Sequence, residues 1–334
     1  MKKILIVGAG WYGCHLGLYL KEKGFKVQIF EKESDLFMGS SDKNQFRLHQ
    51  GYHYPRSAMT INEAKVNYKK FKNKYFKFFY VPKINIYCVA KSESLIDFGT
   101  YVSILKSNNL YYKIKKFNFL RNIEGSVLVK EGVILNSKIK KFYKKKLISE
   151  IKYKKEIQNL YKESKNYDFV IDCTNNTLTN NFLNKIRYIL TISFIYKKRA
   201  GEKAYPLTIM DGKLPSLYPY SNNKGYFTLT HADFTHIKSF KSFDMLKKFR
   251  AKIDKKIISK HKNMSEKSIS NFYKDFNKCF KYNGYFLSYK IIPYGKTDFR
   301  PTLYKKQNNI LSIFSPKIAN IFSAEKVVQE FINA

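Results

Sequence analysis

The chain has 334 residues and a formal net charge of +38, from 63 Lys+Arg against 25 Asp+Glu. Its residues are 44% hydrophobic and 17% aromatic, which excludes a disordered basic tail because enough apolar surface is present to offset the entropy of ordering. The length exceeds what one hydrophobic core organises, so we expect two joined lobes.

The positive charge is mostly lysine. Only seven of the 63 basic residues are arginine, and the lysines are spread along the whole length. Arginine binds phosphates and base edges bidentately, so a nucleic-acid-binding chain is expected to use more of it. We therefore interpret the lysines as a solvated surface. We expect a small, anionic substrate as partner and no nucleic acid.

The cysteines and the hydropathy pattern favour a cytoplasmic protein. Cys14, Cys88, Cys173 and Cys279 lie far apart and form no CxxC pair, which suits a reducing compartment and predicts no metal site. No apolar run approaches the roughly 20 residues that span a bilayer, so we expect no integral membrane segment.

A nucleotide-binding unit opens the chain. Residues 4–7 are a short β-branched apolar run typical of a buried parallel strand. A GxGxxG motif follows at 8–13, then a helical pattern ending at Gly24, a second strand at 27–30, and Glu31 at the end of that strand. This order is the fingerprint of a dinucleotide site.

Each part of this unit has a chemical role. Gly8, Gly10 and Gly13 allow a tight turn, close approach of a pyrophosphate, and tight packing of helix on strand. The helix N-terminus offers free N–H groups to the phosphates, and Glu31 accepts hydrogen bonds from ribose hydroxyls. An acid at this place favours FAD or NAD over NADP.

The segment after Glu31 distinguishes flavin from nicotinamide. Residues 39–55 form a polar loop with one Arg, two His and two Tyr, where an NAD-linked dehydrogenase would continue its sheet. With Ser40, Ser41, His49 and its neighbours Gly51 and Tyr54, this loop resembles that of the D-amino-acid oxidase-like superfamily of FAD-dependent oxidoreductases.

The resemblance recurs at three later places. Residues 167–175 are similar to the strand that returns to the flavin phosphates, although Cys173-Thr174-Asn175 replaces a small-residue pattern. Residues 298–301 contain the family's Arg-Pro, without the Asp-Gly-x-Pro that usually follows. Residues 310–314 and a helix to Phe331 match the last strand and helix, with Ser315 and Lys317 in place of glycines.

This resemblance implies an α/β fold: a Rossmann-like FAD-binding domain with an inserted, mixed or antiparallel β-sheet substrate domain of α+β type. The FAD-binding domain would comprise 1–80, 130–187 and 295–334, and the substrate domain 81–129 and 188–294. The residues expected to bind FAD are Gly8, Gly10, Gly13, Glu31, Lys32, Ser40, Ser41, Arg47, His49, Thr174, Ser315, Lys317 and Ile318.

The expected reaction is oxidation of a C–N or C–O bond of a small polar anion such as an amino acid, hydroxy acid or sugar derivative. The ordinary pKa of histidine suits a base near neutral pH, so His49 is the candidate for taking the substrate proton. The resemblance makes Arg300 a catalytic residue that binds the substrate carboxylate, with Tyr218 and Tyr285 as further substrate contacts. Arg47 is a second candidate for an anionic group, in the substrate or in the FAD pyrophosphate.

Alternatives remain at this point. The same fold serves non-redox flavoenzymes such as nucleotide-sugar mutases, and a basic nucleic-acid-binding or membrane-binding protein with a vestigial nucleotide fold is another possibility. Between the motifs, we predict a helix over 58–80, a strongly basic helix over 240–262, and hairpin turns at Asp211-Gly212 and 222–225.

Overall fold

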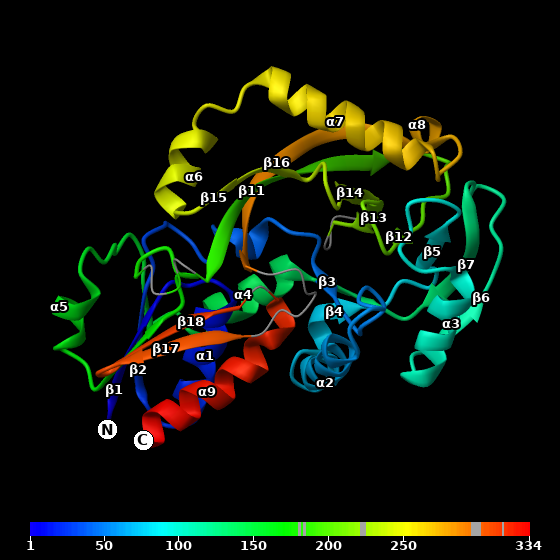
Figure 1. Cartoon of the computed structure of the whole chain (residues 1–334). Helices are drawn as coiled ribbons and strands as arrows, with labels where there is room; N and C mark the ends of the chain where they lie inside the picture. Colours follow the sequence, from blue (N-terminus) through cyan, green and yellow to red (C-terminus); the bar gives the residue numbers. More distant parts are fainter. Residues whose placement is uncertain (180–181, 183–184, 221–224, 295–301, 316) are drawn as a thin grey trace.

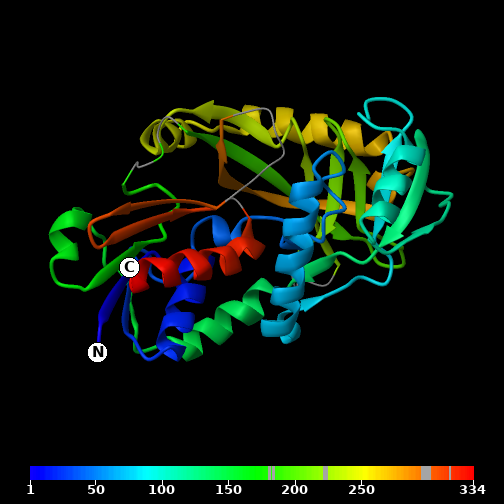
Figure 2. The same cartoon turned by 60° about the horizontal axis from the view of Figure 1, so that its bottom comes forward.

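Two large sheets and a small one that joins them organise the chain (Figure 1). The computed structural model describes residues 1–334 except 180–181, 183–184, 221–224, 295–301 and 316. Figure 1 and the rotated view in Figure 2 both show the first sheet near the two termini and the second arching above it.

The first sheet holds the N-terminal nucleotide motif. Its strands run in the order β17 (Leu303–Gln307), β18 (Ile310–Phe314), β10 (Phe169–Asp172), β1 (Lys3–Val7), β2 (Lys26–Phe30) and β9 (Ile151–Lys152). All neighbours pair in parallel except β17, which is antiparallel to β18. The strands predicted at 4–7, 27–30 and 310–314 are confirmed.

Helices cover this sheet with apolar faces. They are α1 (Trp11–Glu22), α4 (Asn136–Lys146), α5 (Leu160–Ser164) and α9 (Ile321–Asn333). Helix α1 packs against α4 and α9, and buried residues of all three form one core with β1. The parallel strands are buried on both faces, which explains their continuous apolar runs.

The second sheet is built around two long antiparallel strands, β11 and β16. Its strands follow the order β15 (His236–Phe240), β11 (Ile186–Lys198), β14 (Tyr226–His231), β13 (Pro215–Pro219), β12 (Leu207–Met210), β5 (Ile86–Ala90), β7 (Ile123–Val129) and β6 (Tyr112–Ile114), with β16 (Phe280–Pro293) also paired to β11. The predicted turn at 211–212 joins β12 to β13, and Asp211 there has a φ of 59°.

Helices α6 (Phe243–Arg250), α7 (Lys255–Ser270) and α8 (Phe276–Cys279) lie over the second sheet, and α3 (Phe98–Ser107) packs beside β5 and β7 (Figure 1). The single basic helix predicted over 240–262 is wrong, because two helices occupy this region. Ser242 caps α6 and Asp254 caps α7, each accepting a backbone N–H three residues on, so the second cap starts a new helix.

A small sheet of β3 (Arg47–Leu48), β8 (Gly132–Ile134) and β4 (Phe79–Tyr80) lies between the large ones. Helix α2 (Ala58–Lys74) ends six residues before the predicted end of the 58–80 helix, and a 3₁₀ turn at Phe76–Phe78 leads into β4. Within the residues described, no helix is both long and apolar enough to cross a bilayer.

The predicted fold class is confirmed: an α/β nucleotide-binding part and a mixed, largely antiparallel sheet. Strands of the first sheet come from 3–30, 151–172 and 303–314, and those of the second from 86–129 and 186–293. We keep the two-domain division given above as a proposal.

Candidate active site

A cavity of about 1830 Å³ extends from the first sheet to the second. It is larger than the roughly 300–1,000 Å³ typical of a single small-ligand pocket, so it has room for a dinucleotide and a substrate together. We call the part lined by Gly8, Gly10, Glu31, Ser40 and Ser41 the nucleotide end. We call the part lined by Thr191, Ser193, His236, Ser288 and Lys290 the chamber.

The turn after β1 requires glycine. A Cβ at Gly13 would lie 1.8 Å from the carbonyl oxygen of Gly8, so no side chain fits there. Gly8 itself has a φ of 96°, in the left-handed region that favours glycine. Helix α1 starts directly after this turn, with Gly10 at its N-cap and no side-chain cap. The geometry therefore fits a pyrophosphate on the helix N-terminus.

Glu31 lies at the carboxyl end of β2 and is 8% exposed. Its Oε2 accepts a hydrogen bond from the N–H of Ala9 at 2.7 Å, and its Oε1 accepts one from the N–H of Glu33 at 3.0 Å. These bonds hold the carboxylate against the glycine turn while it lines the cavity. This placement fits an acceptor for ribose hydroxyls, and the adjacent Lys32 lines the cavity too.

Two further segments complete the nucleotide end. Ser41 Oγ accepts a hydrogen bond from the N–H of Trp11 at 3.0 Å, which ties the serine loop to the start of α1. Thr174 donates its N–H and its hydroxyl to Asp172 Oδ1, at 2.9 and 2.7 Å. The Cys173 carbonyl oxygen would lie 3.3 Å from a Cβ on Gly8, so the unusual Cys-Thr-Asn segment still follows the turn closely.

The last strand and helix meet the cavity near its middle. Ser315, Lys317 and Ile318 line it, directly before α9. The Tyr12 hydroxyl donates to the carbonyl oxygen of Lys317 at 2.6 Å, and Lys317 Nζ lies 4.2 Å from the centre of the Tyr54 ring. This segment therefore places a cation next to the loop that carries His49.

His49 also faces the cavity, with 24% of its side chain exposed. Its Nδ1 lies 3.1 Å from Glu131 Oε1. Glu131 is fully buried, and its interactions with His49, Arg47 and Tyr87 outweigh the effect of burial and lower its pKa to about 2. An ionised carboxylate only accepts hydrogen bonds, so Nδ1 is the donor and Nε2 carries the free electron pair of a neutral imidazole.

The pKa of His49 itself is lowered, chiefly because burial disfavours the imidazolium, although the Glu131 carboxylate opposes this. His49 is therefore neutral at physiological pH and able to accept a proton. Glu131 was not identified from the sequence. Its only signal is a lone acid between Lys130 and Gly132 at a strand junction, and the topology alone brings it to His49.

Arg47 lies at the centre of a buried polar cluster. Its guanidinium donates to Tyr87, Thr208 and Ser216 at 2.9, 3.0 and 2.6 Å and lies 3.7 Å from Glu131. The cluster joins β3 of the small sheet to β5, β12 and β13 of the second sheet. Arg47 also lines the cavity.

The structure does not bring the other predicted substrate residues together. Tyr218 is buried beneath Arg47, whose guanidinium lies 4.1 Å from the ring centre, and Tyr285 is 42% exposed on β16. Neither is among the cavity-lining residues that the structure describes. Arg300 lies outside the described residues. His231 also lines the cavity and accepts backbone N–H groups of Asp233 and Phe234 through Nδ1.

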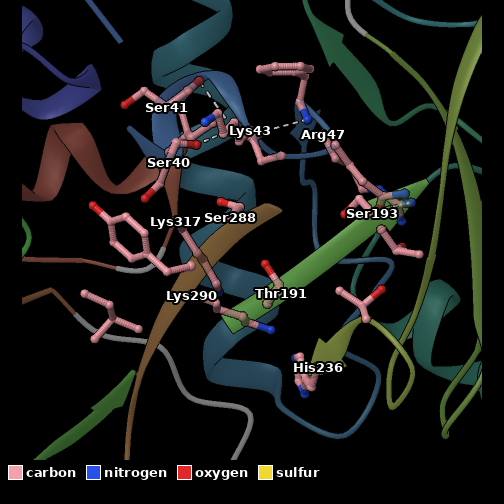
Figure 3. Close-up of a pocket in the computed structure, with 18 of the residues that line it drawn as sticks. Ser40, Ser41, Lys43, Arg47, Thr191, Ser193, His236, Ser288, Lys290 and Lys317 are labelled. Atoms are coloured by element: carbon pink, nitrogen blue, oxygen red, sulfur yellow. Dashed lines mark hydrogen bonds between the residues drawn. The ribbon is translucent and has the colours of Figure 1, made fainter. Parts of the chain in front are cut away.

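The chamber contains residues that sequence reasoning missed. Thr191 and Ser193 on β11, Ser288 and Lys290 on β16, and His236 on β15 line it (Figure 3). The signal was available in part, because Thr191 and Ser193 are two hydroxyl residues at alternate positions of an otherwise apolar strand. Nothing in the local sequence indicated that β16 would pair with this strand.

Comparisons with known proteins agree with this geometry. A model of the family "FAD dependent oxidoreductase", also called DAO, matches residues 3–96. Over 338 residues the chain is 29% identical to the FAD-dependent monooxygenase FPY4 of Fusarium mangiferae, covering 98% of this chain and 90% of that protein. Over 367 residues it is 26% identical to the FAD-dependent monooxygenase kojA of Aspergillus flavus, covering 99% and 86%.

Solved structures share the fold. Glycine oxidase from Geobacillus kaustophilus matches with a TM-score of 0.71 and 9% identity, over 100% of this chain and 95% of that one. L-alpha-glycerophosphate oxidase from Mycoplasma pneumoniae, with FAD bound, matches with a TM-score of 0.70 and 16% identity, over 100% and 96%.

The chain is an FAD-dependent oxidoreductase: residues 3–96 match the DAO family model, and nearly the whole chain is similar to FAD-dependent monooxygenases. Its cofactor is FAD, as the resemblance implied, and the glycine turn and Glu31 fit the adenosine and pyrophosphate part of it. For this flavoenzyme the identification sets aside the two alternatives of a non-redox mutase and a vestigial binding protein.

Proposed function

We propose that this flavoenzyme oxidises a C–O or C–N bond of a small, polar, anionic metabolite, with His49 as the proton acceptor. The observation that carries the proposal is the His49–Glu131 pair, which leaves Nε2 of a neutral imidazole available at the cavity. FAD supplies the two-electron chemistry when bound, because its ring accepts a hydride.

In the proposed reaction, the protein itself provides the group that accepts the substrate proton. As the substrate C–H bond gives up its hydride, the O–H or N–H proton must leave, and His49 Nε2 takes it. Glu131 holds the imidazole in one orientation through Nδ1 and stabilises the imidazolium that forms. The hydride, which contains both electrons of the C–H bond, would go to the cofactor, the proton would go to His49, and the substrate would gain a C=O or C=N bond.

Charge supports an anionic substrate. Lys290 lines the chamber, and Lys247 and Arg250 of α6 line the same cavity. Among the described lining residues, eleven are Lys or Arg and six are Asp or Glu. Lys247 is paired with Asp244 at 2.9 Å, and the acids Asp211 and Asp233 are paired with Arg56 at 2.8 Å and with Lys213 at 3.0 Å.

The test follows the flavin absorbance under anaerobic conditions while small hydroxy acids, amino acids and sugar acids are added. We expect one class of acid to bleach the flavin, and His49→Gln to slow bleaching about 10²–10⁴-fold with FAD content unchanged. His261→Gln is the matched control, since His261 bonds the Phe234 carbonyl oxygen outside the cavity lining. Bleaching of His49→Gln at the wild-type rate would remove His49 as the base.

Oxygen insertion is the second candidate, favoured by the names of the two curated relatives, which are FAD-dependent monooxygenases. In that reaction one atom of O₂ enters the substrate and the other leaves as water, and an external two-electron donor such as NAD(P)H is consumed. A requirement for NAD(P)H, with oxygen from ¹⁸O₂ in the product, would establish it over the first candidate.

A further inference from the structure

Three short hydroxyl side chains lie side by side across the chamber floor. Thr191 on β11 pairs in register with Ser288 on β16, and Ser193 lies two residues further along β11 on the same face. On the other side of β11, Thr191 pairs with His236 of β15. Figure 3 shows these residues around the space that Lys317 and the serine loop border from the nucleotide end.

These three residues are largely buried, but their hydroxyl groups lack partners within the protein. Thr191 is 7% exposed and Ser193 and Ser288 are each 6% exposed. Within the described part of the chain, none of the three hydroxyls has a hydrogen-bond partner, and none of their oxygens is among the fully buried unpartnered atoms, because all three residues line the cavity. The hydroxyls are therefore available to hydrogen-bond a ligand or ordered water.

Other buried hydroxyls of the same sheet are used within the protein. Thr208 and Ser216 both accept hydrogen bonds from the Arg47 guanidinium. Thr228 donates to the Tyr218 carbonyl oxygen at 3.3 Å. The three chamber hydroxyls therefore differ from their neighbours, and the difference is that they face open space next to the expected flavin.

A cation stands next to this row. Lys290 is two residues from Ser288 on β16, and its side chain lines the chamber. After burial, its positive charge lowers the pKa of His236, and it also contributes to lowering the pKa of His53, so the ammonium group acts on both imidazoles. The floor thus combines hydroxyl groups with one positive charge at its edge.

We propose that the chamber binds a polyhydroxylated anion, a sugar-derived carboxylate or phosphate, with its hydroxyls on Thr191, Ser193 and Ser288 and its anionic group at Lys290. This inference rests on the function proposed above and names its substrate class. A sugar hydroxyl both donates and accepts, as serine and threonine do, so the row satisfies several at once. An acid with an apolar chain would instead leave all three hydroxyls buried without a partner, so the site would discriminate against it.

The test compares ligands of matched size by calorimetry on the flavoprotein under anaerobic conditions. D-gluconate and hexanoate are both six-carbon acids that differ in their hydroxyls, and sorbitol keeps the hydroxyls without the charge. Glucose 6-phosphate distinguishes a phosphate from a carboxylate as the anionic group. We expect gluconate or glucose 6-phosphate to bind at least about tenfold more tightly than hexanoate or sorbitol, since each contrast removes interactions worth a kcal/mol or more.

Variants of the chamber residues test whether these hydroxyls and Lys290 cause the preference for polyhydroxylated anions. Each lost hydrogen bond reduces affinity about fivefold, so Thr191→Val with Ser288→Ala should weaken the polyhydroxylated anion about 25-fold and leave hexanoate unchanged. Lys290→Gln should remove the preference for gluconate over sorbitol. Ser239→Ala is the matched control, because Ser239 is an exposed serine of β15 outside the cavity lining.

The inference is overturned if hexanoate binds as tightly as both polyhydroxylated anions, if neither of these binds at millimolar concentration, or if the double variant keeps the full preference. The flavin absorbance recorded in parallel separates this from the proposed function. Bleaching by an acid without hydroxyls leaves the function standing and removes the substrate class. Tight gluconate binding with no bleaching by any acid would support the ligand class and contradict the proposed oxidation.

Discussion

The nucleotide end and the chamber of one cavity are built in different ways. At the nucleotide end, the cofactor site is formed mainly by the backbone and glycines of one contiguous stretch, residues 8–13. Glu31, at the end of the next strand, completes it. In the chamber, side chains from β11, β15 and β16 come together only because these strands, which are far apart in the sequence, pair in the second sheet. The nucleotide end thus depends on local geometry, while the proposed substrate chamber depends on strand pairing between distant segments.

The variant Gly13→Ala tests whether the glycine turn is needed for FAD binding, and it has the largest expected effect. The new methyl group would lie 1.8 Å from the Gly8 carbonyl oxygen, a backbone atom that cannot move aside as a flexible side chain could. We expect a protein that is purified without flavin, measured as loss of visible absorbance relative to absorbance at 280 nm. Gly99→Ala in the surface helix α3, where the nearest neighbour is the Asp97 carboxylate, is the control. Full flavin content in Gly13→Ala would contradict the role of the turn.

Arg47→Met tests the cluster that joins the lobes beneath the chamber. It removes the cation from a fully buried carboxylate, Glu131, and should lower the free energy of unfolding by about 3–5 kcal/mol in chemical denaturation. The double variant with Glu131→Gln should lose less than Arg47→Met alone, since no buried charge is then left unpaired. Equal losses would show that packing, not charge, explains the effect.

Glu31→Ala probes the side-chain part of the nucleotide end. It removes the acceptor for the Ala9 N–H and for the ribose, and charged hydrogen bonds of this kind contribute about 1.5–3 kcal/mol. FAD affinity, measured by reconstitution of the apoprotein, should fall about 10–100-fold. Glu22→Ala at the exposed end of α1 should have no effect on FAD binding.

Glu131→Gln gives the smallest expected change in the reaction of the folded enzyme, a shift in the pH dependence of flavin reduction. The Glu131 carboxylate raises the pKa of His49 against the larger lowering by burial, so its removal lowers that pKa further. The base must be neutral, so the rate of flavin reduction declines as pH falls through the His49 pKa, and the decline should move to lower pH in the variant. A decline at unchanged pH would mean that another group titrates.

The same contrast explains how much was predictable. Strands 4–7 and 27–30, the glycine turn and Glu31 were readable because a fixed spacing of residues determines them. His49 was proposed as a site residue because its loop follows these elements closely and resembles the family's loop. Glu131, Thr191 and Ser288 were not, because strand pairing between distant segments decides their positions. Tyr218 and Tyr285 were expected at the substrate, but residue type alone does not reveal which face of a strand meets the cavity.

The two basic helices found in place of one show that helix boundaries are hard to predict from composition. The Lys-rich pattern over 240–262 is continuous in composition, and only the capping geometry of Asp254 reveals the break. Caps were visible in the sequence as isolated Ser and Asp residues, but such residues are also common within polar helices.

The mass of the product from a single anaerobic turnover tests the central claim most directly. A stoichiometric amount of the acid that bleaches the flavin is mixed with the protein without O₂ or NAD(P)H, and the product is weighed by mass spectrometry, after hydrolysis where an imine forms. We expect a product lighter by two hydrogens, or its hydrolysis product, in an amount equal to the flavin bleached. No product without O₂ and a reductant, and a product heavier by one oxygen atom when both are present, would contradict it.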